Sequence, residues 1–361
     1  MGVATTYGRT GRRWGRAGAR RWSVGLLVSA TVLLTAAGPA LAATPGTRSA
    51  ASAPFPAFDA PSAIAAAGAD LFVANAADST VTEIAAASGS LVATISAKRF
   101  GLDHPTAEAV VGADLFVANG RGDSVSEIKM ASRHHIRTIK GTRYGFSDPV
   151  ALASAGADLF VLNGTGSVTE MATSNGALVG RAAGAAYHFD RPTGIGVADG
   201  LVFVVNSASN SVTVLRAATR AVVATLSGPS FAFSSPIGVT FDGAHVWVTN
   251  QADESVTELS PVTLQALNVV VSGNLPMVGP IAYGDGYVFT VSPPGSSPMV
   301  SQIVPSSADV TWMMCNTNGP YLFNDPQSLA VDGENLWVAN EGGNSLTEMD
   351  ADSGALIRTV F

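Results

Sequence analysis

Charged and imidazole side chains that interrupt an otherwise regular sequence are the candidates for chemistry in this chain. They lie just before a proline, or just after an apolar segment that ends in asparagine. Histidines, arginines and acids in such segments could hold a polar ligand or a divalent ion, although ordinary solvated loop tips have the same composition. The predicted ligand-site residues are His104, Arg121, Asp123, Asp148, His188, Asp190, Arg191 and Asp325, with Asp253 and Glu254 in comparable positions.

Motifs with a fixed chemistry are missing from the sequence. There is no His-Glu-x-x-His and no pair of cysteines, so no strong metal-ligand spacing is present. There is also no Gly-x-Ser-x-Gly turn and no glycine-rich phosphate loop. We therefore expect no metal site and no cofactor, and we assign no catalytic residue. A divalent cation would suit the acids, but no motif supports one.

An acidic residue also recurs at one position of a repeated segment. It is Glu83, Glu127, Glu170, Glu258 and Glu348, while two copies have Val214 and Gln302 there. A residue that occurs once per repeat lies too far from its equivalents to share a proton or a metal with them. We predict a structural role for this set.

These residues are positioned by an internal repeat. Near-copies of one segment begin at Pro61, Pro105, Pro149, Pro192, Pro236, Pro280 and Pro326, in steps of 44, 44, 43, 44, 44 and 46 residues. A fixed period of about 40–50 residues is typical of propellers and solenoids, in which each unit buries its faces against its neighbours.

One repeat contains four short apolar segments, which in the fifth copy are Ile237–Phe241, His245–Asn250, Ser255–Leu259 and Ala266–Val271. Alternating apolar residues and β-branched content predict strands, and Asp242-Gly243 predicts a tight hairpin turn. The chain is therefore predicted to be all-β: a seven-bladed β-propeller of four-stranded antiparallel blades. In such a ring the segments before each Pro and after each Asn share one face, around the mouth of the central channel.

Residues shared by the copies are predicted to be scaffold. The second segment carries an aromatic residue, which we expect to pack between blades, and ends in asparagine, which we expect to form a left-handed turn. The aromatic residues are Phe72, Phe116, Phe160, Phe203, Trp247, Phe289 and Trp337, and the asparagines are Asn75, Asn119, Asn163, Asn206, Asn250 and Asn340, with Ser292 in the sixth copy. Aromatic pairs before the prolines are predicted to be wedges between blades: Tyr144/Phe146, Tyr187/Phe189, Phe231/Phe233 and Tyr321/Phe323.

Residues 1–42 have the order of a secretory signal peptide: a basic lead, an apolar run over Val24–Ala37, and the small-residue site Ala40-Leu41-Ala42. A membrane anchor is the alternative, but the run is shorter than the roughly 20 residues that a span needs. We expect a flexible lead-in over 43–54 and the propeller over 55–361. The protein is then secreted, extracellular or associated with the cell surface, without a membrane span after processing. The export route, general secretory or twin-arginine, stays open.

The charge balance argues against nucleic acid as a partner. Six of the 20 basic residues lie in the leader, so 14 remain against 27 acidic residues, a formal charge of −13. Nucleic-acid affinity comes mainly from neutralising phosphates, which needs the opposite sign. The basic residues are unevenly placed: Lys129, Arg133, Arg137, Lys140 and Arg143 form a strip in the second repeat, and none occurs from Ala221 to Ile357. The lone Cys315 is predicted to be a buried, inert thiol.

The segments Leu71–Asn75, Val246–Asn250 and Leu336–Asn340 resemble the core of YVTN-type propeller repeats, and Asn344–Val360 is similar to the rest of such a unit. The resemblance covers residues 61–361. It implies an exported binding surface, as in this family and in the related NHL-repeat proteins. The same architecture also hosts streptogramin lyases similar to virginiamycin B lyase, which use a histidine and acids with magnesium near the ring axis. That set does not map onto particular positions of this sequence.

We therefore predict an exported, monomeric binding or interaction module with its ligand surface at the channel mouth. Its ligand would be a protein, a glycan or a small molecule. The alternative is a lyase or hydrolase with a metal-assisted site on the same face. The sixth repeat has Pro293–Ser297 in place of the usual turn, where we expect either a specialised loop or sequence drift. The ends of the ring are expected to meet between repeats seven and one, with Phe55 and Phe58 as the wedge.

Overall fold

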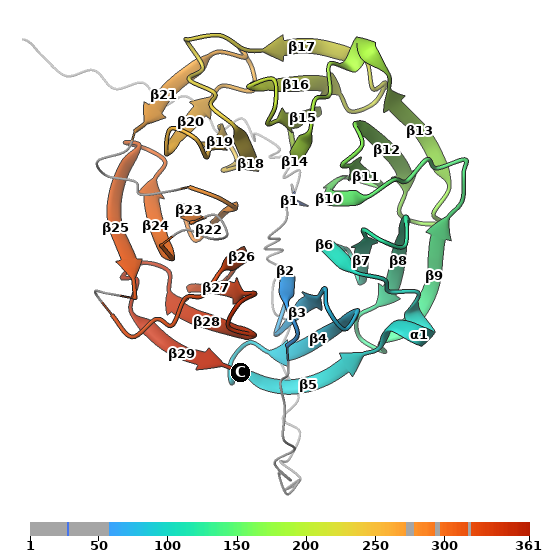
Figure 1. The fold of residues 1–361 in the computed structure, drawn as a ribbon, viewed down its shortest axis with the longest axis vertical. Coiled ribbons are helices and arrows are strands. Elements are labelled where there is room, and N and C mark those ends of the chain that lie inside the picture. The colour runs from blue at the N-terminus through green and yellow to red at the C-terminus, as the bar shows by residue number, and fades with distance from the viewer. Residues whose placement is uncertain (1–26, 29–57, 272–277, 293–296, 317–318) are drawn as a thin grey trace, which may run out of the picture.

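Seven blades of four consecutive strands each stand around one axis in the computed structural model of the chain (Figure 1). The model describes residues 27–28, 58–271, 278–292, 297–316 and 319–361. The predicted seven-bladed β-propeller is confirmed. The predicted leader apart from residues 27–28, the lead-in with Phe55, and Pro293–Gly295 with Ser296 of the sixth repeat lie outside the described residues.

Each blade is built from four consecutive strands, numbered outward from the axis. Blades one and two are β2 (Pro61–Ala67), β3 (Asp70–Asn75), β4 (Thr80–Ala85), β5 (Ser90–Ile95), and β6 (Pro105–Val111), β7 (Asp114–Asn119), β8 (Ser124–Lys129), β9 (His134–Lys140). Blades three and four are β10 (Pro149–Ala155), β11 (Asp158–Asn163), β12 (Ser167–Ala172), β13 (Leu178–Ala183), and β14 (Pro192–Ala198), β15 (Leu201–Asn206), β16 (Ser211–Arg216), β17 (Val222–Leu226).

Blades five and six are β18 (Pro236–Phe241), β19 (Val246–Asn250), β20 (Ser255–Leu259), β21 (Ala266–Val270), and β22 (Ile281–Gly284), β23 (Tyr287–Val291), β24 (Met299–Val304), β25 (Asp309–Cys315). Blade seven is β26 (Pro326–Asp332), β27 (Asn335–Asn340), β28 (Ser345–Asp350), β29 (Leu356–Val360). Two short helical turns, α1 (Ala97–Phe100) and η1 (Ala185–Tyr187), lie in connections between blades. The two-residue strand β1 (Leu27–Val28) pairs antiparallel with β10.

The hydrophobic core consists of seven clusters, one at each junction between neighbouring blades. Phe72 of blade one packs with Leu115 and Val117 of blade two, and Trp337 of blade seven packs with Ile64 of blade one. The seven recurring aromatic residues of the second strands are each at most 1% exposed. The predicted role of these aromatic residues in blade-to-blade packing is confirmed.

The aromatic pairs before the prolines act as wedges, as predicted. Tyr144 and Phe146 stack with ring centroids 5.3 Å apart and pack between blades two and three. At the junction of blades seven and one, Phe58 is 1% exposed and fills the same place. Because each sheet keeps four consecutive strands, the ring closes by side-chain packing and by contacts such as the Ala60 amide donating to Asn344 Oδ1 at 2.9 Å.

The repeated asparagines are structural, but not by the predicted mechanism. They do not adopt the left-handed backbone expected for a turn former. Asn75 is instead fully buried: its amide donates to Thr80 and Thr82 hydroxyls at 3.0 and 2.9 Å, and its Oδ1 accepts the Asp59 amide. Buried polar groups need such partners, and the asparagine therefore ties the second strand to the third strand and to the incoming connection. Cys315 is half-buried on an outer strand, less enclosed than predicted.

Candidate functional site

The face that carries the predicted ligand residues is fixed by a repeated backbone geometry. The residue before the first strand has a positive φ of 48–55° in six blades, at Ala60, His104, Asp148, Arg191, Ser235 and Asp325. Its carbonyl accepts the amide of the residue that follows the buried asparagine, as in Gly120 to His104 and Gly164 to Asp148. A left-handed backbone is uncommon for residues other than glycine, although histidine and aspartate tolerate it better than alanine, serine or arginine. The hydrogen bond holds this conformation in all six blades.

Two of the predicted ligand residues are used within the ring. The His104 ring places Nδ1 3.1 Å from the Ala76 carbonyl oxygen, and Asp123 Oδ1 accepts the Asp148 amide at 2.8 Å. Ser79, Asn210 and Asn344 form the same kind of contact with the next blade. His104 and Asp123 therefore have scaffold contacts between neighbouring blades.

Four further predicted residues are spread over this face. Arg121, Asp148 and Arg191 are exposed and belong to blades two, three and four, while Asp325 is half-buried at the start of blade seven. The structure does not bring them together at one point. Asp253 and Glu254 lie on blade five, exposed and half-buried respectively.

His188 and Asp190 do share a site, a hollow of about 590 Å³ between blades three and four. Both side chains are exposed, and the His188 backbone is left-handed with φ 54° at the end of η1. Five hydroxyl side chains complete the polar wall: Thr165, Ser209, Ser211, Thr225 and Ser227. We did not predict the hydroxyls, although the serine-rich run from Ser207 to Ser211 is visible in the sequence.

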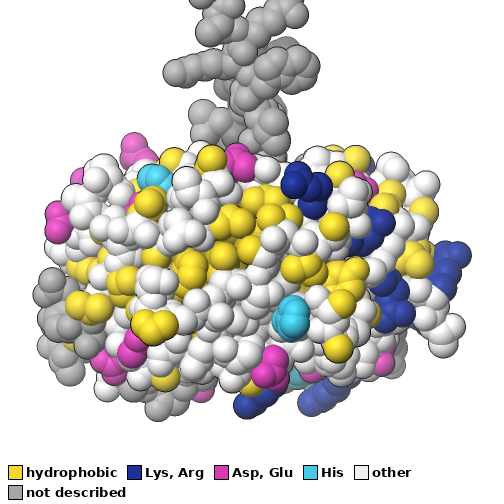
Figure 2. All heavy atoms as spheres, turned by 90° about the horizontal axis from the view of Figure 1, so that it is seen from above, with side chains coloured by type: hydrophobic (Ala, Val, Ile, Leu, Met, Phe, Trp, Pro, Cys, Tyr) yellow, Lys and Arg dark blue, Asp and Glu magenta, His cyan; other side chains and the backbone are white. Residues whose placement is uncertain are grey.

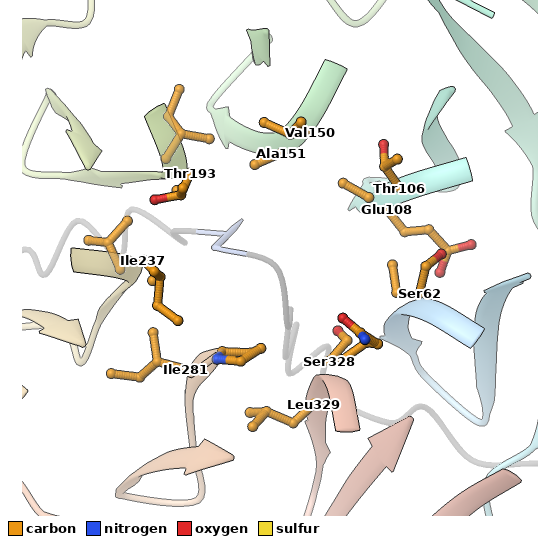
Figure 3. A pocket seen from close by; sticks show the side chains of 18 of the residues that line it. Ser62, Thr106, Glu108, Val150, Ala151, Thr193, Ile237, Ile281, Ser328 and Leu329 are labelled. Atoms are coloured by element: carbon orange, nitrogen blue, oxygen red, sulfur yellow. The ribbon is translucent and has the colours of Figure 1, made fainter. Parts of the chain in front are cut away.

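The channel itself holds a smaller cavity of about 300 Å³, lined by the first strand of every blade (Figure 3). Its wall includes apolar side chains such as Val150, Ile237 and Leu329. The hydroxyls of Ser62 and Thr106 are occupied, because they donate to the Pro105 and Pro149 carbonyls of the next blade at 2.7 and 2.6 Å. These contacts lock neighbouring inner strands together.

Glu108 is the exception in this wall. In the strand register it takes the place that Ile64, Leu152, Ile195, Val239, Ile281 and Leu329 occupy in the other blades. It is 2% exposed, and within the described part of the chain neither carboxyl oxygen has a hydrogen-bond partner. Figure 3 shows its carboxyl group between β6 and β2. Burial raises the pKa of Glu108 well above its usual value. The signal was in the sequence, as the single acid in seven aligned positions, and our prediction missed it.

The five recurring glutamates each meet a separate partner, which agrees with the predicted structural role. Arg137 and Arg358 lie opposite Glu127 and Glu348 in the register and pair with them at 2.9 and 2.5 Å. Opposite Glu170 stands Gly180, and there Arg220 of the next blade reaches across to form the ion pair.

Glu83 follows the same pattern, with Ala93 opposite and Arg133 of the next blade as partner. Glu258 instead has His245, whose Nδ1 lies 2.9 Å from its Oε1. Burial raises the pKa of Glu170, against the opposing effect of the Arg220 hydrogen bond.

Most of the basic residues in the blade-two strip form ion pairs or ring contacts within the propeller. Arg133 and Arg137 hold buried glutamates, and Lys129 pairs with Asp114 at 2.9 Å. Arg143 lies over the Tyr144 ring at 4.7 Å, and Lys140 is exposed. The strip is therefore a weaker surface charge than the sequence suggests.

No set of three or more His, Cys, Asp or Glu side chains in the described part of the chain is arranged to hold a metal ion. His104 and His188 belong to different blades, and within the described ranges neither forms an ion pair with a carboxylate. None of the described helices is long and apolar enough to cross a membrane.

Comparison with known proteins identifies the architecture and no more. No protein-family model and no curated protein matches the sequence. Among solved structures, hydrazine synthase from Kuenenia stuttgartiensis is similar, with a TM-score of 0.63 at 16% identity over 82% of this chain and 94% of that chain. A chain of the mitotic checkpoint complex has a TM-score of 0.62 at 14% identity, over 86% of this chain and 97% of that one. The computationally designed Ika8 protein has a TM-score of 0.60 at 16% identity, over 83% and 86% of the two chains. Likeness at this identity concerns the fold alone.

Proposed function

We propose that this chain is an exported binding module of the YVTN type, with its ligand site in the hollow between blades three and four. The observation that carries the proposal is this hollow of about 590 Å³, where polar side chains from separate segments meet on one rigid junction. Sites of this kind, on loops held by a rigid scaffold, are where binding residues usually collect. The signal-peptide pattern of residues 1–42 supports export, and the repeated Val-Ala-Asn and Val-Thr-Asn ends support the repeat type.

The chemistry of the wall favours a glycan as the ligand. Hydroxyl groups both donate and accept hydrogen bonds, and five of them line the hollow beside the His188 imidazole and the Asp190 carboxylate. Phe189 adds a partly exposed aromatic ring against which the apolar face of a sugar can pack. The volume lies within the roughly 300–1,000 Å³ range of small-molecule sites.

An oligosaccharide array probed with the protein produced from its full-length sequence tests the proposal. We expect binding to a defined group of neutral or acidic oligosaccharides. The Asp190→Ala variant should weaken it by about tenfold, since a hydrogen bond to a charged group contributes roughly 1.5–3 kcal/mol. Only the carboxylate is lost in this variant, because the contact of Asp190 with Asn206 uses its backbone amide.

Arg121→Ala is the matched control, since Arg121 is exposed on the same face but outside the hollow. This variant should bind as the unaltered protein does. Absence of binding across the array, or equal binding by the Asp190→Ala variant, would refute the site.

A further inference from the structure

The hollow between blades three and four lies where one link between neighbouring blades is missing. At four other junctions, the residue immediately before the third strand accepts the backbone amide of the residue that precedes the next proline. We call these the clamp residues, and each has a left-handed backbone with φ of 43–58°. They are Ser79, Asp123, Asn210 and Asn344, with oxygen-to-nitrogen distances of 2.7–3.0 Å.

Blade three has Gly166 in the clamp position, directly before β12 and with φ 95°. Glycine has no side-chain oxygen, and the corresponding amide of the next blade, that of Arg191, has no hydrogen-bond partner among the described residues. Gly166 lines the hollow, and a Cβ built on it would lie 3.7 Å from the Phe189 carbonyl oxygen and 3.8 Å from the Phe189 Cβ. The space that a clamp side chain would fill therefore belongs to the hollow.

The aromatic wedge at the same junction is less enclosed than the others. Tyr187 and Phe189 are half-buried, with ring centroids 5.6 Å apart. The other three pairs are buried: Tyr144/Phe146, Phe231/Phe233 and Tyr321/Phe323. Tyr144 and Tyr321 also donate to a carbonyl of the blade that follows, at 2.7 and 3.1 Å, whereas the Tyr187 hydroxyl has no hydrogen-bond partner within the described ranges. Phe189 lines the hollow, so part of this wedge is accessible to a ligand.

We propose that a hydroxyl group of a neutral sugar takes the clamp position beside Gly166 and accepts the Arg191 amide, while the apolar face of the sugar ring packs against Phe189. This inference rests on the proposed function and narrows its ligand. At the junction of blades one and two, the Ser79 hydroxyl accepts the His104 amide at 3.0 Å, so an uncharged hydroxyl meets the needs of this position. A hydroxyl can also donate to a second group of the wall at the same time.

The charges around the hollow favour a neutral sugar over an acidic one. Among the residues that line it, Asp190 is the single Asp, Glu, Lys or Arg, and its carboxylate forms no ion pair within the described part of the chain. Figure 2 views the ring from the side of β17: Lys and Arg gather toward its right side and lower rim, and the middle of the wall is mostly apolar or uncharged. A uronate carboxylate in the hollow would therefore meet a like charge without a lining cation to offset it.

An array of glucose- and galactose-based oligosaccharides, each beside its uronate counterpart, tests this inference with the protein produced from its full-length sequence. The neutral member of a pair should bind at least about tenfold more tightly than the uronate, because like charges at a contact are costly. Gly166→Asn should weaken binding by about tenfold, since the new amide oxygen takes the Arg191 amide, as Asn210 and Asn344 do for their neighbours. Gly166→Ala is the matched control: it has the same backbone strain and an added Cβ but no acceptor, and it should bind within about threefold of the unaltered protein.

Circular dichroism checks that both Gly166 variants keep the sheet content of the unaltered protein. Equal binding by the two variants, or equal binding of neutral and uronate partners, overturns the inference. The comparison of neutral and uronate sugars uses the unaltered protein, so it decides the question even if Gly166→Asn does not fold. Failure of the proposed function gives a different result, because then no oligosaccharide binds or Asp190→Ala binds as the unaltered protein does. Failure of this inference alone leaves binding that depends on Asp190.

Discussion

Two buried glutamates, each at a junction between blades, differ in how their burial is compensated. Glu170 is paired with Arg220, which crosses β13 at Gly180, where a Cβ would lie 2.4 Å from the arginine Nε. Glu108, at the junction of blades one and two, has no hydrogen-bond partner for either carboxyl oxygen among the residues that the structure describes. Both are about 2% exposed. Taking a carboxylate out of water is costly unless a partner compensates for the lost hydration.

The comparison shows that the recurring third-strand glutamates belong to the scaffold, whereas Glu108 departs from the repeat. The glutamate of the third strand recurs with a cation in reach, so partner and acid belong to the repeat. Glu108 replaces an aliphatic residue of the inner strand, and no Lys, Arg or His of the described ranges forms an ion pair with it. Burial without a compensating cation raises the pKa of Glu108 well above the usual value for glutamate.

Arg220→Met should produce the largest effect, because it leaves the buried Glu170 carboxylate without its cation. We expect a loss of about 3 kcal/mol in the free energy of unfolding, typical of breaking a buried pair from one side. Urea unfolding measures it. Arg216→Met is the control, since Arg216 is an exposed residue of the same blade, and should change stability by less than about 0.5 kcal/mol.

Adding Glu170→Met to Arg220→Met should recover most of the loss, because an apolar pair of similar size needs no compensation. If Arg220→Met is no more damaging than Arg216→Met, the ion pair does not stabilise the ring. The comparison with Glu108 would then lose its basis.

Glu108→Leu should have the next largest effect, and of the opposite sign. Leucine is the residue at the same register in blade three, so the substitution restores the repeat and removes an unpartnered polar group. Leaving such a group buried costs about 1–3 kcal/mol, and we expect a gain in stability near neutral pH of that order. The unfolding free energy from urea titrations checks it.

The pH dependence of this gain has a definite sign. The folded pKa of Glu108 is raised, so above about pH 4.3, the ordinary value for glutamate, the folded protein holds a proton that the unfolded chain releases. The stability of the unaltered protein therefore falls as pH rises, by up to about 1.4 kcal/mol per pH unit, until the raised pKa is passed. Glu108→Leu should remove this decline. Glu334→Gln, a change at an exposed acid, should not.

The fold could be predicted from the sequence because each of the seven repeats has the same pattern of apolar, aromatic and turn residues. The seven-fold aromatic residue and the alternating strands around it determine the blade junctions, and the structure places Phe72 and its equivalents there. The site was harder to predict because single positions do not reveal which loops converge. His188 and Asp190 meet in one hollow, whereas Asp123 is held by the Asp148 amide. Whether a loop residue is free to bind a ligand or is held by the scaffold depends on hydrogen bonds between residues 25 apart in the chain. No local sequence pattern predicts these hydrogen bonds.

Glu108 was missed for a different reason. Ionisable residues in predicted loops are the usual candidates for a binding site. An acid inside a predicted strand is instead taken as one of the polar residues that alternate with apolar ones. Aligning the seven inner strands by register, as the structure does, makes it stand out at once. The same alignment shows that the five third-strand glutamates differ in their partners, and blade five is the odd one among them.

His245→Arg should produce the smallest effect and would sharpen the comparison among the paired glutamates. In blades one, two, three and seven the partner of the glutamate is arginine, which is always charged. In blade five it is His245, half-exposed and also 3.9 Å from Asp242. Arginine carries a full charge and a planar fork of donors that matches a carboxylate, so it should hold Glu258 more strongly than the imidazole does.

The Arg variant should be more stable than the unaltered protein by about 0.5–1 kcal/mol, the scale of a partly exposed ion pair. Urea unfolding measures the difference. His134→Arg is the control, because His134 is exposed on β9 and forms no ion pair within the described residues, and it should change stability by less than about 0.5 kcal/mol. Equal stability of the two variants would mean that Asn268, which also donates to Glu258, satisfies this carboxylate without a full positive charge beside it. Blade five would then resemble the arginine blades in stability, and Glu108 would remain the one glutamate of this comparison with neither a hydrogen-bond nor an ion-pair partner among the described residues.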